Sequence, residues 1–223
     1  MSQSNSNTMW TAVIVIIVVS VIGMFFLAGG GSNTSIDDIS INNDEIDLSQ
    51  EWVKGNPEAE HIIVEYSDFQ CPACAGRAPM LSTIMKEFKN DVAFVYRHFP
   101  LPQHEHAFIT GQAAEAAGQE GKFFEMHDII FDNQAAWQSM SVSQVEELML
   151  DYAEQIGISD MEAFEKYMNS SEARDAVETD YIGGVALGIN STPTVFFNGE
   201  VVPNSYNYDA FRAAIRSAIQ GDN

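Results

Sequence analysis

The chain has 223 residues and a net charge of −22, from 32 acidic and 10 basic side chains. No residue before Asp37 is ionisable apart from the amino terminus, so the acidic charge belongs to residues 37–223. Such a surface repels phosphates, which excludes nucleic acid as a partner. The length suits one domain with an appendage, and 46% hydrophobic residues allow that domain a core without disulfide staples.

The amino-terminal part of the chain is apolar. After a short flank at residues 1–8, residues 9–29 form an uncharged run long enough to cross a membrane as a helix. A cleaved signal peptide is the alternative, but the run exceeds a usual signal core and no clear Ala-x-Ala site follows. The sequence therefore predicts a retained transmembrane anchor, although no Lys or Arg flanks it to set its orientation.

Residues 30–50 have the composition of a tether. A Gly-Gly-Gly-Ser-Asn-Thr-Ser stretch, which begins at Gly29, is followed by a mixture of Asp, Asn, Ile and Ser without aromatic residues. Segments of this kind are typical of flexible linkers. We therefore expect the folded domain to cover residues 51–223.

Two β-rich runs enclose a helical pattern near the start of this domain. Residues 61–66 and 92–96 are short apolar runs of the buried-strand type. Between them, a helix should run from the cysteines to about Asn90, and Pro79 should kink it. Its apolar residues recur at helical spacing: Met80, Leu81, Ile84, Met85 and Phe88. Strand, helix and strand predict a βαβ unit.

A long helical region follows at about residues 106–187. It should hold four or five helices, with capping boxes that begin at Ser143 and Ser159. The chain then returns to β character at residues 194–198, turns at Asn198-Gly199, and continues as a strand at residues 200–202. A final helix is predicted at about residues 208–220.

The chain has only two cysteines, Cys71 and Cys74. A disulfide that closes so short a loop would stabilise the fold by only about 2 kcal/mol, so reactivity is the better reason for the pair. At the amino end of a helix, free amides and the positive helix end stabilise a thiolate on Cys71 and lower its pKa. Cys74, one turn later, can attack a mixed disulfide and release the partner.

A Cys-x-x-Cys segment is also half of a zinc site. Zinc would need two further ligands, and only histidines remain to supply them: His98, His104 and His106 lie near one another in sequence. His104-Glu105-His106 is more typical of an exposed helix start, and His98 of a structural residue. We therefore favour the redox interpretation and expect no metal.

Glu65 is a carboxylate inside an otherwise apolar run, six residues before Cys71. It would face solvent if this side of the strand were exposed. If it points inward beneath the helix, desolvation raises its pKa and suits it to carry a proton to or from Cys74.

In these motifs the chain resembles the DsbA-type thiol–disulfide oxidoreductases of the thioredoxin superfamily, over roughly residues 51–221. The resemblance rests on four segments: residues 65–74 (Glu-Tyr-Ser-Asp-Phe-Gln-Cys-Pro-Ala-Cys), residues 96–101 (Tyr-Arg-His-Phe-Pro-Leu), residues 121–127 (Gly-Lys-Phe-Phe-Glu-Met-His) and residues 191–196 (Ser-Thr-Pro-Thr-Val-Phe). It implies an α/β, thioredoxin-like fold with a central mixed sheet and a helical insertion at about residues 104–188, here preceded by one transmembrane helix.

The resemblance also implies a substrate-binding surface. Pro193 should be cis and lie against the cysteine pair, with Thr192 presenting backbone groups to an extended peptide, while Pro72 and Ala73 complete the surface. Strand addition at such an edge would explain broad substrate choice. The family has an acidic residue at the position of Glu65, which favours the inward orientation. Its most oxidising members have a histidine where this chain has Ala73, so a less extreme oxidant is expected.

The predicted function is oxidation of exported proteins by the Cys71–Cys74 disulfide, with no other cofactor. Unfolded or reduced exported proteins are the expected substrates, and a membrane-embedded redox partner would recycle the pair. The alternatives are a reductase or isomerase of the same fold, and a metal-binding or chaperone module. We expect a single-pass protein of the cell membrane, its amino terminus cytoplasmic and its catalytic domain outside, where disulfides persist.

Overall fold

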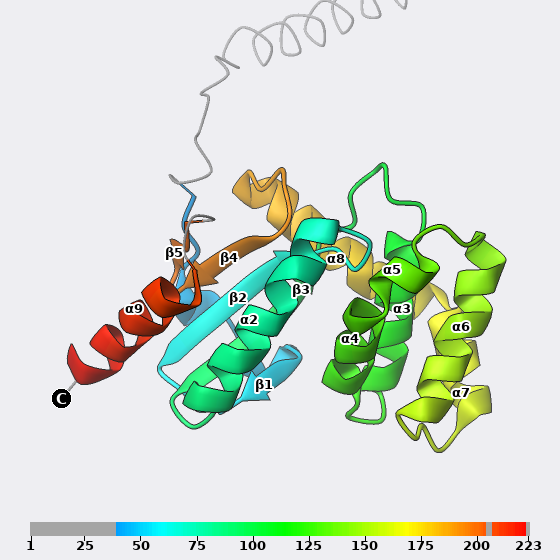
Figure 1. The fold of residues 1–223 in the computed structure, drawn as a ribbon, viewed down its shortest axis with the longest axis horizontal. Coiled ribbons are helices and arrows are strands. Elements are labelled where there is room, and N and C mark those ends of the chain that lie inside the picture. The colour runs from blue at the N-terminus through cyan, green and yellow to red at the C-terminus, as the bar shows by residue number, and fades with distance from the viewer. Residues whose placement is uncertain (1–38, 204–206, 222–223) are drawn as a thin grey trace, which may run out of the picture. The chain divides into compact units, whose positions relative to one another are not determined.

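A mixed five-stranded sheet lies at the centre of the computed structural model of this protein, which describes residues 39–203 and 207–221 (Figure 1). The strand order is β1-β3-β2-β4-β5. β2 and β3 are parallel, and the other neighbouring pairs are antiparallel. The strands are β1 (Val53–Gly55), β2 (His61–Ser67), β3 (Val92–His98), β4 (Thr194–Phe197) and β5 (Glu200–Val201). The α/β thioredoxin-like class with a mixed sheet is thus confirmed.

β2 is the central strand, and all seven of its residues are buried. Strands covered on both faces read as continuous apolar runs, which explains why this strand was predictable from sequence. Glu65 stands in the middle of it, opposite Tyr96 of β3 and Val195 of β4. A carboxylate at this position is buried whichever face it occupies.

Helices cover both faces of the sheet (Figure 1). α2 (Pro72–Phe88) and α9 (Tyr208–Gly221) lie on one face, and α8 (Ser171–Leu187) passes behind the other. Each face has its own apolar cluster. The first includes Ile63 and Phe94 with Leu81 of α2, and the second includes Val64 and Val95.

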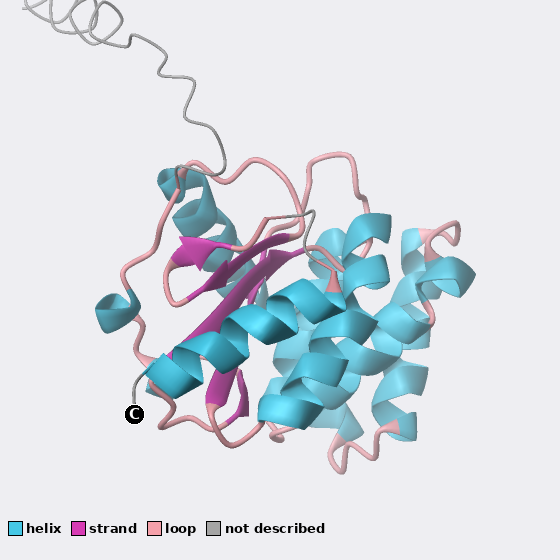
Figure 2. Ribbon diagram, turned by 60° about the vertical axis from the view of Figure 1, so that its left-hand side comes forward, coloured by secondary structure: helices cyan, strands magenta, loops and turns pink. Residues whose placement is uncertain are grey.

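Most of the helical insertion stands beside the sheet (Figure 2), whereas its last helix, α8, passes behind the sheet. The predicted four or five helices are six in the described residues, because the short α5 had not been expected. The six are α3 (Ala107–Gly118), α4 (Phe123–Asp132), α5 (Gln134–Trp137), α6 (Val142–Gln155), α7 (Met161–Met168) and α8.

Both predicted capping boxes are wrong in position. Gln144 accepts a hydrogen bond from the amide of Ser141 (3.0 Å), so the N-cap of α6 is Ser141, two residues before the predicted Ser143. α7 is capped by Asp160, whose side chain accepts from the amide of Ala163. The amide and hydroxyl of Ser159 bind Glu120 instead. In each case a different polar residue near the predicted position caps the helix: Ser141 caps α6 and Asp160 caps α7.

The predicted turn between β4 and β5 is confirmed. Asn198 has φ 50° and Gly199 has φ 87°, the left-handed values that a tight hairpin of this type requires. The chain also passes very close to Gly199, since a Cβ there would lie 2.4 Å from the carbonyl oxygen of Ile41. Glycine is therefore required at this position for two reasons.

The tether predicted at residues 30–50 extends too far. Ile39 is buried, Ser40 forms a bridge with Glu200, and the amide of Ile41 donates to the carbonyl of Gly199 (2.9 Å). Two 3-10 turns follow, η2 (Asn43–Glu45) and η3 (Leu48–Gln50). Residues 39–50 thus belong to the folded domain, because the free edge of β5 offers them backbone partners.

The predicted anchor at residues 9–29 lies outside the described residues. In the part of the chain that the structure describes, no helix combines the length and the apolar character that a membrane span requires.

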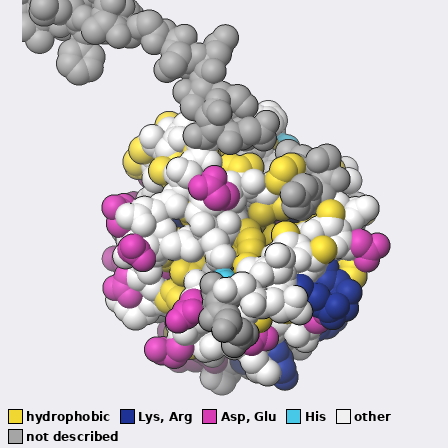
Figure 3. All heavy atoms as spheres, turned by 90° about the vertical axis from the view of Figure 1, so that its left-hand side faces the viewer, with side chains coloured by type: hydrophobic (Ala, Val, Ile, Leu, Met, Phe, Trp, Pro, Cys, Tyr) yellow, Lys and Arg dark blue, Asp and Glu magenta, His cyan; other side chains and the backbone are white. Residues whose placement is uncertain are grey.

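Acidic side chains are scattered over the face shown in Figure 3, whereas Lys and Arg gather on one side of it. Several of the few cations form ion pairs. Arg212 and Arg216 of α9 both contact Glu87 of α2 at 2.6 Å, and Lys54 contacts Asp128 at 2.8 Å. These pairs connect helices and strands of the fold and leave most of the surface negative.

Substitution of Gly184 tests the packing of α8 on the sheet. A Cβ at this position would lie 2.8 Å from the ring of Phe99 and 3.0 Å from that of Tyr66, both buried. We expect Gly184→Ala to lower the free energy of unfolding by about 1–3 kcal/mol through overpacking. At the neighbouring Gly183 a Cβ would meet nothing within 4 Å, so Gly183→Ala should raise the free energy of unfolding by about 0.5–1 kcal/mol through its higher helix propensity. Urea unfolding measures both, and equal effects would contradict the packing argument.

Candidate active site

Cys71 occupies the N-cap of α2. Its backbone is extended (φ −74°, ψ 120°), and Pro72 takes the first helical position, where no amide is needed. The Cys71 amide donates to the carbonyl of Asp68 (3.0 Å), so the connection from β2 is a tight turn. The unpaired amides of the first helical turn therefore surround the cysteine sulfur.

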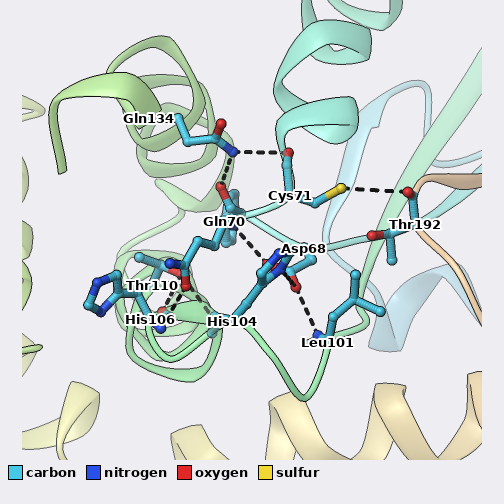
Figure 4. A network of polar contacts seen from close by, with 11 residues as sticks. Asp68, Gln70, Cys71, Leu101, His104, His106, Thr110, Gln134 and Thr192 are labelled. Carbon is cyan, nitrogen blue, oxygen red and sulfur yellow. Dashed lines mark hydrogen bonds and ion pairs between the residues drawn. The ribbon is translucent and has the colours of Figure 1, made fainter. Parts of the chain in front are cut away.

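The thiol of Cys71 lies in an environment that favours its ionised form. Hydrogen bonding with the Cys74 thiol is the largest cause, and Thr192 and the amides of Cys74 and Ala73 add to it. Together they outweigh burial and lower the pKa of Cys71 to about 5. Its Sγ lies 3.5 Å from the carbonyl oxygen of Thr192 (Figure 4).

Cys74 has the opposite character. It is fully buried, and both cysteines are free thiols. Burial first, then the hydrogen bond with Cys71 and the charge of Glu65, raise the pKa of Cys74 well above that of an ordinary thiol. At neutral pH the pair therefore consists of one thiolate, on Cys71, and one thiol, on Cys74.

Glu65 points into the protein and is 1% exposed, so the solvent-facing alternative is wrong. Burial raises the pKa of Glu65 to about 7, although the charge of Arg77 and a hydrogen bond from the Ser67 hydroxyl (3.2 Å) act in the other direction. A carboxyl group that titrates near neutrality can both give and accept a proton there. Its role as the proton carrier for Cys74 stays a prediction.

The segment before β4 completes the site. The Thr192–Pro193 peptide bond is cis, as the resemblance implies, and Pro193 is buried. The carbonyl of Thr192 faces Cys71, while Pro72 and Ala73 are exposed on the first turn of α2. The structure thus brings the predicted substrate-binding residues to the mouth of the site, and their binding role is untested.

Asp68 was not singled out from sequence, yet it organises the loop before Cys71 (Figure 4). One carboxylate oxygen accepts from the amide of Gln70 (2.7 Å). The other accepts from the amide of Leu101 (2.8 Å) and lies 2.7 Å from Nδ1 of His104. The carboxylate is buried and connects the active-site loop to the loop after β3.

Gln134 of α5 holds the same loop from the insertion. Its side-chain amide donates to the carbonyls of Phe69 (2.7 Å) and Cys71 (3.0 Å), as Figure 4 shows. Gln70 in turn accepts from the amide of His106 (2.7 Å). No local sequence signal marks Gln134, because its partners lie more than 60 positions earlier.

The three histidines considered as zinc ligands have other neighbours. His98 contacts Glu115 (3.0 Å), His104 contacts Asp68, and the ring of His106 lies against Trp137. Within residues 39–203 and 207–221, no group of three or more His, Cys, Asp or Glu side chains is placed to hold a metal ion.

Comparison with known proteins identifies the family. Residues 48–217 match the family model described as Thioredoxin, which covers more than half of the chain. The chain belongs to the thioredoxin family. The crystal structure of oxidised BdbD from Bacillus subtilis has a TM-score of 0.68 and 23% identity, over 78% of this chain and 95% of that one. The thiol-disulfide exchange protein α-DsbA2 from Wolbachia pipientis has a TM-score of 0.64 and 18% identity, over 74% and 86%. At these identities the likeness establishes the fold.

Sequence relatives carry a different name. The chain is 33% identical over 177 residues to the Na(+)/H(+) antiporter NhaA 1 of Salinispora arenicola, a match that covers 79% of this chain and 26% of that protein. The chain thus spans about a quarter of the length of the curated relatives it matches.

The two hydrogen bonds by which Gln134 holds the loop before α2, here called the Gln134 clamp, can be tested by Gln134→Leu. This change removes the side-chain donor of the buried Phe69 carbonyl and leaves the Cys71 carbonyl with the Ala75 amide (3.1 Å), which should lower the free energy of unfolding by about 1–3 kcal/mol. Hydrogen exchange of the amides around Cys71 should become faster. The exposed Gln138, at the end of the same turn, is the control: Gln138→Leu should change stability by less than about 0.5 kcal/mol. Equal exchange rates in the two variants would rule the clamp out.

Burial of Glu65 predicts a pH-dependent stability. The pKa of Glu65 is about 7 in the folded state, above its ordinary value of 4.5, so the folded protein holds this proton more tightly. As pH rises from about 4.5 to 7, the wild type should lose about 3 kcal/mol of stability relative to Glu65→Gln, and no more above that. Denaturant unfolding of both proteins at pH 4 and pH 8 gives the difference. A constant difference would show that the carboxyl group is not perturbed.

Proposed function

We propose that this protein is an extracytoplasmic thiol–disulfide oxidoreductase that introduces disulfides into exported proteins. The observation that carries this function is the opposite ionisation of the two cysteines at the start of α2. Cys71 is stabilised as a thiolate and Cys74 as a thiol, with the carbonyl of Thr192 beside the reactive sulfur. Such an arrangement favours the reduced pair and makes its disulfide oxidising.

In the first step, a thiolate of the reduced substrate attacks Cys71 Sγ of the Cys71–Cys74 disulfide. Cys71 is the target because it is 6% exposed, whereas Cys74 is fully buried. The bond between the two cysteines breaks, and Cys74 leaves as a thiolate that takes a proton. We assign that proton to Glu65, because its carboxyl group titrates near pH 7 and its charge acts on Cys74.

In the second step, another substrate thiolate attacks the substrate sulfur of the mixed disulfide. The substrate gains a disulfide, and Cys71 leaves as a thiolate. Its lowered pKa makes it a good leaving group. We propose that a membrane-embedded redox partner then accepts the two electrons and restores the Cys71–Cys74 disulfide, with no other cofactor and no metal.

Substrate recognition would use the segment before β4. The carbonyl of Thr192 can accept a hydrogen bond from an extended peptide laid beside it, next to the exposed Pro72 and Ala73. Main-chain bonds of this kind bind many sequences, which suits a general oxidase.

The direction of the reaction depends on how strongly the thiolate is stabilised. Ala73 offers only its amide to Cys71, so we expect a moderate oxidant; a reductase or isomerase is the second candidate.

BdbD and the thiol-disulfide exchange protein from Wolbachia share the fold and support oxidoreductase chemistry. Antiport is not proposed, because the match covers only a quarter of those relatives. We place the domain outside the cytoplasm on the predicted anchor at residues 9–29.

The test is disulfide formation in a reduced, unfolded protein supplied with glutathione disulfide. Wild type should accelerate it at substoichiometric concentration, and Cys71→Ala should give the uncatalysed rate. Cys74→Ser should accumulate a covalent complex in which Cys71 is bonded to the substrate and which dithiothreitol releases, because Cys74 can no longer attack Cys71 and displace the substrate. Equal rates for wild type and Cys71→Ala would exclude the oxidoreductase.

The reduction potential separates the two directions. A value well above that of thioredoxin, which is about −270 mV, supports the oxidase. A value at or below it would assign the protein to the reductases.

A further inference from the structure

A buried tyrosine lies beneath the active site and has no part in the proposed reaction. Tyr96 of β3 stands opposite Glu65 of β2 in the parallel register, so both side chains point to the same face of the sheet. Tyr96 shares its apolar cluster with Cys74 of α2, and its ring stacks on that of Phe69 (centroids 5.0 Å apart, planes 19° apart). The hydroxyl is buried, and no atom of the described residues is placed to pair with it.

This hydroxyl calls for an explanation, because a buried polar group without a partner costs free energy and is uncommon in native proteins. Burial, and then the charge of Cys74, raise the pKa of Tyr96 well above its ordinary value. The hydroxyl therefore keeps its proton and is available as a hydrogen-bond donor. The largest charge that acts on it belongs to a sulfur that is ionised only while the disulfide opens or closes.

Ser67, at the end of β2, connects Tyr96 with the second cysteine. Its buried hydroxyl donates to Oε1 of Glu65 (3.2 Å). Burial is the largest effect on the pKa of Tyr96 and of Cys74 and raises both, whereas hydrogen bonding by Ser67 acts in the opposite direction on each. A serine hydroxyl has one hydrogen to donate and two lone pairs to accept with. Ser67 can therefore donate to Glu65 or to Cys74, but not to both.

Arg77 is a further polar group of α2 near this sulfur. Its charge interacts with both Glu65 and Cys74. Because a guanidinium is charged in every state of the cycle, it favours the carboxylate and the thiolate alike. The two hydroxyls are neutral and rotate, so they can follow the negative charge from one group to the other.

We propose that Ser67 and Tyr96 stabilise the thiolate of Cys74 while the disulfide opens or closes. The inference rests on the proposed function. When a substrate thiolate bonds to Cys71, the bond between the cysteines breaks and its electron pair stays on Cys74. The Ser67 hydroxyl turns its hydrogen from Glu65 to Cys74 Sγ, and Tyr96 donates to the Ser67 oxygen. Glu65 then gives its proton to the sulfur, and both hydroxyls return. Closing follows the same steps in reverse.

Stabilisation of the thiolate alone has a distinct kinetic result. Cys74 is bonded to Cys71 in the oxidised protein and is a neutral thiol in the reduced protein, so neither end state contains the charge that the hydroxyls stabilise. Loss of a hydroxyl should therefore slow opening and closing by the same factor and leave the equilibrium between the two states in place. A purely structural role would change stability or the equilibrium instead.

The experiment uses the full-length protein and Tyr96→Phe, which removes only the hydroxyl. Opening is the reduction of the Cys71–Cys74 disulfide by dithiothreitol, followed by acid quenching and thiol counting. Closing is measured on the reduced protein with an aromatic disulfide that releases a coloured thiolate. The first release reports attack by Cys71, and the second reports attack by Cys74.

We expect Tyr96→Phe to slow opening and the second release about fivefold each, the effect of one hydrogen bond lost from the transition state. The first release and the equilibrium constant with glutathione should change by less than about twofold. Stability to urea should stay the same or rise, because the hydroxyl has no partner in the part of the chain that the structure describes.

Tyr66→Phe is the matched control. Tyr66 is as buried as Tyr96, but it belongs to the apolar cluster on the other face of the sheet, and its hydroxyl accepts from Arg97 (2.9 Å). This variant should lose stability with its hydrogen bond and keep the wild-type rates of opening and of both releases.

Ser67→Ala tests the order of the two hydroxyls. At pH 6, where Glu65 is mostly protonated, it should slow opening about tenfold, because the donor to the sulfur is missing. Since Tyr96 acts through Ser67, adding Tyr96→Phe to Ser67→Ala should have no further effect on opening.

Three results would overturn the proposal: wild-type rates in Tyr96→Phe, unequal slowing of opening and of the second release, or additive effects in the double variant. A wild type whose disulfide dithiothreitol does not open, or a second release that persists in Cys74→Ser, would instead overturn the oxidoreductase function.

Discussion

The chemistry of this site depends on where α2 begins. The helix starts one residue after Cys71, and the amides of its first turn have no partner within the helix. Because β2 ends at Ser67 and the Cys71 amide closes a turn onto Asp68, the helix cannot start elsewhere without breaking that turn. One cysteine therefore lies at the positive helix end, and the next, one turn inside, lies in the core. Their opposite pKa shifts follow: the hydrogen bond with the Cys74 thiol, and then Thr192 and the amides of the first turn, lower the pKa of Cys71, whereas burial raises the pKa of Cys74.

The second constraint is the central strand. β2 is covered on both faces, so a carboxylate within it is desolvated, and the fold is less stable at neutral pH than it would be with a neutral side chain. Ser67 and Arg77 offset only part of this cost. A buried acid that titrates near pH 7 beside a thiol that must gain and lose a proton has a chemical use, and we regard that use as the reason for its place in an otherwise apolar strand.

Local patterns made part of the structure predictable. Each of these patterns spans only a few neighbouring residues: the apolar runs of β2 and β3, the Asn-Gly turn, and the Cys-x-x-Cys at a helix start. β1 was missed because it has three residues, one of them Gly55 with φ 103°. Gln134 could not be found, because its role exists only when α5 packs against a loop more than 60 positions away. The helix starts at Ser141 and Asp160 were misplaced because several polar residues competed for each cap.

The order of the strands places the segment before β4 and the Lys54–Asp128 ion pair on opposite sides of β2. β4, which follows Thr192, lies on one side of β2, whereas β1, which carries Lys54, lies beyond β3 on the other side. α2 runs between these sides, with the cysteines at its amino end and with Ala78 and Ser82, one and two turns later, lining a small space together with Lys54 and Asp128. A peptide bound at Thr192, as proposed, would therefore leave uncovered the cleft that residues of β1, α2 and α4 line.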